Sequence, residues 1–402
     1  MEQSFVPLLF GGDINVYSMA RAFHEAYGIK SIAYGFFQSG PCRGSRILDY
    51  RACPDNDRTE TLLENVKAVA EEYPDKTVLV LGCGDNYLNA ISKNLPNYPA
   101  NVIAPYVNHE LLSTLIHKAR FYELCEKYGL DYPDTVVYRK GMGHGFELPF
   151  DGPFVVKPAE SDTYWKHPFP TQKKAYVLQT RDEVDRVIDE IYGAGYEDEI
   201  IIQDFIPGDD SYMRVVTNYS DEAGRVALMC VGHVLLEEHT AHAIGNHAVI
   251  LTEHEPELCE KIRGFLDELG FTGFSNLDVK YDRRDGRFKV FEINCRQGRS
   301  NYYVTATGYN LARCLVEDRV EHKPHGLTMV DEPRLWMVVP RGVAFQYISR
   351  EYHERMHSLI AQGKSVNPLF YGKDTALLHK LRILNGHRRY YGWYASVMEK
   401  VR

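Results

Sequence analysis

The chain has 402 residues, of which 44% are hydrophobic and 25% are charged. This length and composition are typical of a globular protein with two or three domains. The formal net charge of −9 excludes bulk electrostatic attraction to nucleic acid or to an anionic membrane, so we expect neither as a partner.

Eight cysteines are scattered along the chain without any Cys-x-x-Cys pair, which indicates neither a disulfide framework nor a zinc site. The first residues, MEQSFVPLLFGG, lack the basic segment and the long apolar run of a secretion signal. No stretch approaches the roughly 18 consecutive apolar residues of a membrane span. We therefore expect a cytoplasmic protein.

The N-terminal part alternates strands and helices. Residues 6–10 predict a buried strand, and a helix and a second strand follow, up to residue 37. Residues 77–82 (TVLVLG) predict another buried parallel strand. Ligands of such sheets lie beyond the carboxyl ends of the strands. The turns at 11–13 and 82–86 are therefore candidate substrate contacts, with ordinary tight turns as the alternative.

Two lysines stand out in the next part. Residues 109–130 predict one helix that contains Lys118 and ends at Gly129. A single lysine on a helix is usually a solvated charge. Lys157, in contrast, ends an apolar strand, where it needs an anion or a lowered pKa. Residues 161–174 (SDTYWKHPFPTQKK) predict an exposed, aromatic-rich loop.

Thr180 and Glu183 predict a capping box at the start of the following helix. The stretch EIIIQDFIPGDDS (199–211) then predicts a buried strand that opens at Pro-Gly into two carboxylates, and a β-hairpin over 212–237 follows. The next segment carries three histidines, which could bind a metal or could simply be hydrogen-bonded within the fold. These are His239, His242 and His247.

A hairpin with an Asp-Gly turn is the most informative stretch. A three-residue loop (284–286), with Gly286 in its left-handed last position, would set Asp278 opposite Glu292. The same register would set Asn294 opposite Asn276. Facing carboxylates repel unless a cation lies between them.

Carboxylate and amide oxygens suit Mg²⁺, which binds one or two carboxylates together with substrate phosphates. Arg296 and Arg299 follow the hairpin and could meet anions. The hairpin therefore predicts a metal–nucleotide platform, with a solvated hairpin face as the alternative.

The order of these features resembles the ATP-grasp superfamily of carboxylate–amine ligases. The strings that carry the resemblance are VVKP, IIIQDFIPGDDS, GFTGFSNLDVKYD and FEINCRQGRS, the last of which is similar to the Glu-x-Asn-x-Arg element of that superfamily. Within it, KPAESDTYW, QDFIPGDDS, the IGN stretch and EINCRQGRS are most similar to the D-aspartate ligase branch.

The resemblance implies an α/β fold of the α+β ATP-grasp type. An N-terminal α/β domain (1–112) would precede an ATP-grasp domain (113–318), whose antiparallel sheets enclose the nucleotide. The subdomains of the latter would span about 113–205 and 206–318. Residues 319–402, rich in His, Arg and Tyr, would form a C-terminal extension that covers or completes the core.

The resemblance also implies a role for each matching residue. The lysines would meet the ATP phosphates, the strand and its loop would hold the nucleoside, the hairpin would ligate two Mg²⁺ ions (Mn²⁺ could substitute), and the arginines would act in catalysis. The implied phosphate-binding residues are Lys118 and Lys157; the nucleoside-binding residues are Gln203, Asp204, Phe205, Ile206 and Asp210; the metal ligands are Asp278, Glu292 and Asn294; and the catalytic residues are Arg296 and Arg299.

The sequence departs from the superfamily pattern at three places. Residues 159–174 contain no glycine where a glycine-rich phosphate loop is expected, Cys295 replaces a frequent proline, and Gln203 replaces the usual acid. We therefore expect the phosphates to be covered by a different kind of loop.

The activity implied is ATP-dependent ligation of a carboxylate to an amine through an acyl phosphate. The partners would be a small-molecule carboxylate donor and an amine acceptor, for example D-aspartate or a similar amino acid and a peptidoglycan precursor. Two alternatives remain open: a ligase of small amino acids or dipeptides, and a non-catalytic ATP-binding regulatory protein on the same scaffold. A homodimer is also left open.

Overall fold

The computed structural model describes residues 3–37, 40–240, 243 and 245–401. The chain forms two compact units. The first unit comprises Met1–His109, Asp210–Asn276 and Asn294–Arg402, and the second comprises Glu110–Asp209 and Leu277–Ile293. The division into domains that the sequence suggests stays a prediction beside these two units.

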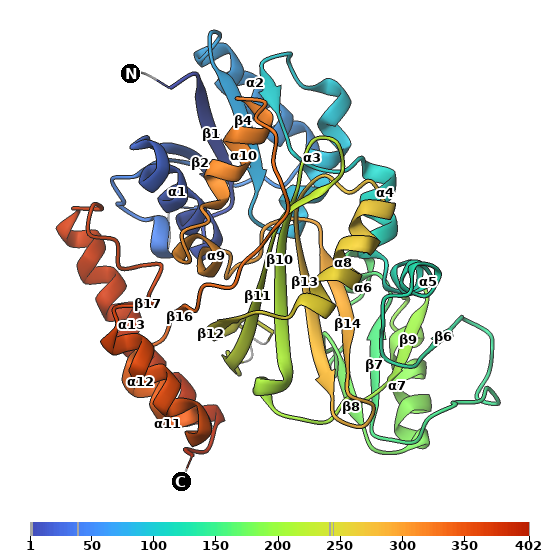
Figure 1. Cartoon of the computed structure of the whole chain (residues 1–402). Coiled ribbons are helices and arrows are strands. Elements are labelled where there is room, and N and C mark those ends of the chain that lie inside the picture. The colour runs from blue at the N-terminus through green and yellow to red at the C-terminus, as the bar shows by residue number, and fades with distance from the viewer. Residues whose placement is uncertain (1–2, 38–39, 241–242, 244, 402) are drawn as a thin grey trace. The chain divides into compact units, whose positions relative to one another are not determined.

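A five-stranded parallel sheet opens the first unit, in the order β3-β2-β1-β4-β5 (Figure 1). Its central strands β1 and β4 are apolar runs buried along nearly their whole length, as expected for a parallel sheet covered on both faces. The predicted alternation of strands and helices is confirmed. The elements are β1 (Phe5–Phe10), α1 (Ile14–Tyr27), β2 (Ser31–Gly35), β3 (Leu48–Ala52), α2 (Thr59–Glu72), β4 (Thr77–Gly82), α3 (Asp85–Asn94) and β5 (Val102–Ile103).

A second sheet has eight strands in the order β14-β13-β10-β11-β12-β16-β17, with β15 beside β11. The predicted hairpin over 212–237 is its β10–β11 pair. The hairpin of β13 and β14 begins in the first unit and continues into the second. The strands are β10 (Met213–Ser220), β11 (Val226–Glu237), β12 (His247–Glu253), β13 (Gly273–Asp282), β14 (Arg287–Asn294), β15 (Thr328–Met329), β16 (Leu335–Met337) and β17 (Ser365–Val366).

The C-terminal residues complete this sheet, because β16 pairs with β12 and β17 pairs with β16. Trp336 on β16 is fully buried, which makes the extension part of the core. Among the described residues, no helix is long and apolar enough to cross a membrane. The remaining helices of this unit are α8 (Pro256–Glu268), α9 (Tyr302–Ala306), α10 (Leu311–Arg319), α11 (Arg341–Tyr347), α12 (His353–Ala361) and α13 (Leu377–Val397).

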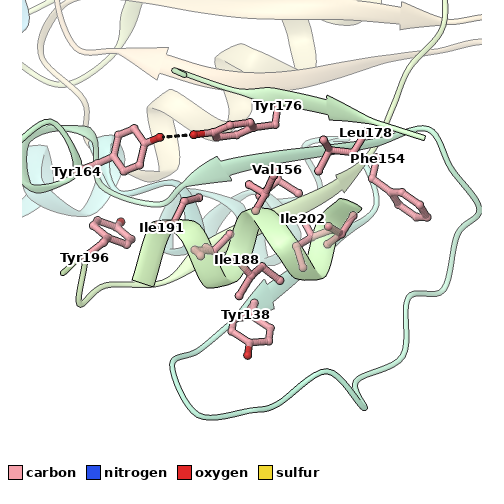
Figure 2. Packing of buried hydrophobic residues seen from close by; sticks show 13 residues of the cluster. Tyr138, Phe154, Val156, Tyr164, Tyr176, Leu178, Ile188, Ile191, Tyr196 and Ile202 are labelled. Carbon is pink, nitrogen blue, oxygen red and sulfur yellow. Dashed lines mark hydrogen bonds between the residues drawn. The ribbon is translucent and has the colours of Figure 1, made fainter. Parts of the chain in front are cut away.

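The second unit contains a four-stranded antiparallel sheet in the order β6-β9-β7-β8. Helix α7 (Arg181–Gly193) packs its apolar side on this sheet (Figure 2). The helix begins with the predicted capping box, in which Thr180 and Glu183 bond each other's backbone amides. The strands are β6 (Thr135–Tyr138), β7 (Phe154–Pro158), β8 (Tyr176–Leu178) and β9 (Ile200–Asp204).

The prediction that the segment 161–174 is an exposed loop is wrong in part. It starts with the short helix α6 (Ser161–Tyr164), and Tyr164 lies in the core of the second unit. Its hydroxyl group is 2.9 Å from that of Tyr176 (Figure 2) and donates to the carbonyl of Lys173. These bonds satisfy the phenol, so the ring can be buried without an unpaired polar atom.

The predicted single helix over 109–130 is in fact two, α4 (His109–Ile116) and α5 (Lys118–Tyr128). His117 between them has an extended backbone (φ −82°, ψ 109°). The amide of Lys118 donates to the carbonyl of Ala159 at 3.0 Å instead of continuing the first helix. Lys118 therefore stands at the first position of a helix.

The turn of the β13–β14 hairpin contains four residues (283–286), so the predicted three-residue loop is wrong. Gly286 is left-handed, as predicted (φ 72°), but its amide donates to the carbonyl of Asp282 at 2.8 Å. The Asp282 carboxylate draws the turn together, because it accepts from Arg284 and from Lys289. The turn therefore does not support the register from which the pairing of Asp278 with Glu292 was inferred, and that pairing stays a prediction.

Candidate active site

A cluster of lysines in the second unit contains Lys157, a lysine with a strongly lowered pKa. Lys157 is the residue before the last in β7, is only 8% exposed, and donates from Nζ to the hydroxyl of Tyr122 at 2.9 Å. Burial lowers the pKa of Lys157 to about 7, and the positive charges of Lys118 and Lys174 act in the same direction, while Glu292 opposes them. The lysine can therefore gain a full charge when an anion arrives.

Lys118 and Lys174 extend this cluster. The Nζ atom of Lys118 lies 3.4 Å from Ser161 Oγ, and the residue is buried at the start of α5. Lys174 ends the glycine-free segment, and its Nζ lies 4.0 Å from Glu292 Oε1. Lys174 was not singled out from the sequence, although the Lys-Lys pair in a loop without glycine was the available signal. We define Lys118, Lys157 and Lys174 as the lysine cluster.

The predicted adenine-side residues lie on or just after β9. Gln203 is buried, and its Nε2 donates to Thr135 Oγ1 at 2.8 Å. This bond leaves Oε1 as the acceptor, and the Tyr122 hydroxyl donates to it at 3.4 Å. Gln203 stands where the superfamily usually has an acid, and its two hydrogen bonds fix the orientation of its amide group.

The backbone amides of the two residues after Gln203 already donate hydrogen bonds within the second unit. The amide of Asp204 donates to Asp134 at 2.9 Å and that of Phe205 donates to Pro153 at 3.2 Å. The Asp204 carboxylate accepts from the Arg284 guanidinium. Ile206 is buried. A ligand here would therefore meet side chains and carbonyl oxygens rather than these two amides.

The hairpin provides oxygen donors of the kind that Mg²⁺ takes. Asp278 and Glu292 are half-buried carboxylates on β13 and β14, and Glu292 is the carboxylate that acts on Lys157. Asn294 donates from Nδ2 to the carbonyl of Asn276 at 3.4 Å. The Asp278 and Glu292 carboxylates are ligands of the kind that a hard divalent cation takes.

The first unit holds the two predicted arginines. Arg296 makes a two-pronged ion pair with Asp85, with Nε–Oδ1 at 2.7 Å and Nη2–Oδ2 at 2.9 Å. Arg299 Nη2 lies 3.1 Å from Glu238 Oε1. Asp13 caps α1 by accepting from the amide of Asn15 at 3.0 Å. Burial raises the pKa of the Asp13 carboxyl group, and both arginines oppose the shift.

The two predicted substrate turns of the first unit line one cavity of about 440 Å³. Gly11–Asp13 follows β1, whereas Cys83, Gly84 and Asn86 follow β4. Aromatic side chains supply much of the remaining wall: Phe36, Phe37, Tyr50 and Tyr87. The cavity therefore lies at the carboxyl ends of parallel strands, where ligands of such sheets are found.

The remaining predicted residues are bonded within the first unit. Asp210 Oδ2 accepts from the amide of Glu237 and from His239 Nε2, each at 2.8 Å. His247 is buried on β12, 3.5 Å from Ser300 Oγ. His242 lies outside the described residues. His239 and His247 thus follow the hydrogen-bonded alternative.

Comparison with known proteins identifies the family, although no family model matches the chain. The chain is 42% identical over 388 residues to a D-aspartate ligase of Enterococcus faecium (strain Aus0004), covering 93% of this chain and 92% of that protein. The chain belongs to the D-aspartate ligase family. It is an ATP-grasp carboxylate–amine ligase, an enzyme that forms carbon–nitrogen bonds, as the resemblance implied.

Solved structures confirm the ATP-grasp fold at low identity. An L-amino acid ligase from Bacillus licheniformis is 16% identical with a TM-score of 0.55, covering 79% of this chain and 75% of that one. An N5-carboxyaminoimidazole synthetase from Staphylococcus aureus, solved with ADP, is 12% identical with a TM-score of 0.62, covering 89% and 87%. The biotin carboxylase domain of a Hydrogenobacter thermophilus 2-oxoglutarate carboxylase, solved with MgADP, is 13% identical with a TM-score of 0.61, covering 81% and 72%.

Proposed function

We propose that this chain uses ATP to join a carboxylate of D-aspartate, or of a similar amino acid, to an amine of a peptidoglycan-precursor peptide. The observation that carries the proposal is the 42% identity to a D-aspartate ligase across 93% of the chain. The reaction consumes ATP, and we place it in the cytoplasm.

The reaction has two steps. A carboxylate oxygen of the donor attacks the γ-phosphorus of ATP, so that ADP leaves and an acyl phosphate forms. The acceptor amine then attacks the acyl carbon, phosphate leaves, and the amine loses a proton as the amide forms. Charge develops mainly on phosphate oxygens, so catalysis depends on positioning and on positive charge.

The lysine cluster is the proposed phosphate site. Lys118, Lys157 and Lys174 present three cations, and Glu292 is the carboxylate that offsets them. Lys174 takes the place of the missing glycine-rich loop by bringing a side-chain cation to the phosphates instead of backbone amides. Loading of this site with phosphate restores the proton that burial removes from Lys157.

Asp278, Glu292 and Asn294 are the residues that would hold Mg²⁺, with two ions as the expected number. When bound, Mg²⁺ neutralises phosphate oxygens and makes the phosphorus more open to attack. Without the metal, the Glu292 carboxylate would face the phosphates directly and repel them.

The predicted residues on and after β9 are the proposed binding site for the nucleoside of ATP. The fixed Oε1 of Gln203 would accept from the adenine amino group, as the acid does in relatives that carry one. The segment Asp204, Phe205 and Ile206 would line the base, and Asp210 would accept from the ribose hydroxyl groups.

The cavity of the first unit is the proposed amino-acid site. Aspartate carries an ammonium group and two carboxylates, so it needs both signs of charge in its binding site. Asp13 lines this cavity and can meet the ammonium group. Arg296 and Arg299, whose charges act on Asp13, are the proposed partners of carboxylates or of the oxyanion formed during amine attack. The bidentate ion pair with Asp85 already fixes the orientation of the Arg296 guanidinium.

The experiment is an ADP-release screen with mass detection of the amide. D-aspartate, L-aspartate, D-glutamate and D-alanine are each paired with a muramyl-peptide precursor and with free amino acids as acceptors. We expect ADP and amide from D-aspartate with the precursor. Amide formation from L-amino acids with free amino acids alone would replace the proposal with the small-molecule alternative.

A further inference from the structure

Helix α13 presents four exposed leucines on one stretch of its surface. Leu377, Leu381 and Leu384 are spaced four and three residues apart, so they lie on one face, and Leu378 adjoins them. Their exposed fractions are 69%, 53% and 40%, and that of Leu378 is 67%. We define these four residues as the leucine patch.

The opposite face holds α13 on the first unit, so the patch belongs to a fixed helix. His379, Ile383 and Tyr394 are buried. His379 Nδ1 lies 3.2 Å from the carbonyl of Arg43, and the hydroxyl of Tyr394 donates to the carbonyl of Glu237 at 2.6 Å. The leucines therefore face outward because the other side of the helix is docked.

The charge of α13 is opposite to that of the whole chain. Its 21 residues include no Asp or Glu, although the chain has a net charge of −9. Four exposed cations flank or continue the patch, and none of them forms an ion pair with a described residue. They are Lys380, Arg382, Arg388 and Arg389.

Two aromatic side chains follow the patch toward the end of the helix. Tyr391 is 44% exposed and Trp393 is 43% exposed. Tyrosine and tryptophan are favoured at the boundary between lipid and water, because each has an apolar ring and one polar group. Exposed leucines, cations and aromatic side chains also occur together on helices that lie at a membrane interface.

We propose that α13 lies flat on an anionic lipid surface, with the leucine patch among the acyl chains and the four cations at the lipid phosphates. A second copy of the chain is the less suitable occupant. Pairing two copies of α13 would bring eight cations together with no carboxylate on either helix to neutralise them. An anionic membrane supplies that negative charge, and it attracts a local basic cluster even when the whole protein is acidic.

Vesicle sedimentation of the full-length protein tests this assignment. The vesicles are phosphatidylcholine alone, or phosphatidylcholine and phosphatidylglycerol in equal parts, each at low and at high salt. We expect the protein to sediment with the anionic vesicles at low salt, and binding to weaken in high salt and on neutral vesicles.

Two variants separate the contributions. Leu377→Ser/Leu381→Ser/Leu384→Ser should weaken binding by at least about tenfold. Lys380→Gln/Arg382→Gln/Arg388→Gln should weaken it on the order of 100-fold at low salt, at roughly 1 kcal/mol for each cation. The control Leu327→Ser, at a 43% exposed leucine outside α13, should bind like the wild type. Circular dichroism and ADP formation should be unchanged in all three, since none touches the proposed active site.

Equal binding to neutral and anionic vesicles, or no binding to either, would overturn the proposal. So would anionic-vesicle binding that survives both triple substitutions, because another surface would then be responsible. A concentration-dependent dimer that is lost in the leucine variant, without lipid binding, would identify a second copy as the occupant instead.

Discussion

Two cations of this enzyme, the buried Lys157 in the second unit and the half-buried Arg296 in the first, are held in opposite ways. Lys157 meets the neutral hydroxyl of Tyr122, and burial lowers its pKa to about 7. Arg296 is forked onto the Asp85 carboxylate and keeps its charge. The lysine therefore has a charge that depends on its ligand, whereas the arginine has a permanent charge with a preset direction.

This difference matches the two proposed tasks. Phosphate groups bind and leave in every cycle, and a lysine with a pKa near 7 can take up a proton as they bind. Stabilising a developing oxyanion requires a charge that is in place beforehand, since reorganisation during the reaction would raise the barrier.

The largest effects are expected at Lys157 and at Glu292. Lys157→Met should lower the rate of ADP formation by about 1,000-fold or more, because the proposed phosphate contact is lost. The fold should stay intact, since methionine fills similar volume and removes a cation that is costly to bury. Rapid-quench measurement of ADP checks this, with Lys166→Met as the control at an exposed lysine of the same unit. Turnover within about tenfold of the wild type would remove Lys157 from the phosphate site.

Glu292→Gln should also abolish measurable ADP formation while leaving the melting temperature nearly unchanged. The amide cannot supply the negative charge that the proposed metal site requires. Steady-state assays over a range of Mg²⁺ concentrations provide the measurement, and Glu147→Gln, at an exposed acid of the same unit, is the matched control. Wild-type turnover in Glu292→Gln would end the metal assignment.

Asp85→Asn tests the preset direction of Arg296. Loss of the bidentate ion pair leaves the guanidinium charged but held only by its bonds to the Gln297 carbonyl and to Asn294 Oδ1, so kcat/KM should fall by about 10- to 100-fold. Asp75→Asn, at another exposed acid of the first unit, should have no effect. The pH profile of the residual activity should keep its shape, because arginine stays protonated. An unchanged rate would show that the fork on Asp85 does not position Arg296 for the reaction.

The pH dependence of ATP binding tests the ligand-dependent charge of Lys157. The pKa of Lys157 in the free protein is about 7, and a bound phosphate raises it, so binding takes up a proton above neutrality. ATP affinity should therefore fall by up to about tenfold per pH unit from about pH 7 to about pH 9. Calorimetry in buffers of different ionisation enthalpy would detect the proton uptake. A flat profile in the wild type, or an equal slope in Lys157→Arg, would contradict this origin.

The smallest effect is expected at helix α7, which packs on the sheet that contains Lys157. Thr180→Ala removes half of the capping box of α7 and should lower the free energy of unfolding by about 1 kcal/mol. Thr180→Ser, which keeps a hydroxyl group, should cost much less. Chemical denaturation followed by circular dichroism measures both, and ADP formation under native conditions should be unaffected.

Local signals made much of the fold predictable from sequence. Strand β4 is a continuous apolar run, and the box of Thr180 and Glu183 is written in four adjacent residues, so both were predicted correctly. The break at His117 was missed because it depends on a bond from Lys118 to Ala159, far away in sequence. The hairpin turn was misjudged because the bonds to Asp282 favour four residues over three.

The candidate site shows the same division. Lys157 was predictable because a lysine that ends an apolar strand needs an anion. Lys174 was not, because only the folded chain brings it to Glu292. Net charge was also an incomplete guide, since a value of −9 says nothing about a 21-residue helix without a single acid.

The most direct test of the central proposal follows an oxygen atom from donor to phosphate. D-aspartate labelled with oxygen-18 in its carboxylates is incubated with ATP, Mg²⁺ and the muramyl-peptide acceptor, and the released phosphate is analysed by mass spectrometry. An acyl phosphate formed on D-aspartate predicts one oxygen-18 atom in each phosphate, in step with amide formation. Unlabelled phosphate alongside the amide would contradict carboxylate activation, and labelled phosphate without the amide would contradict the proposed acceptor.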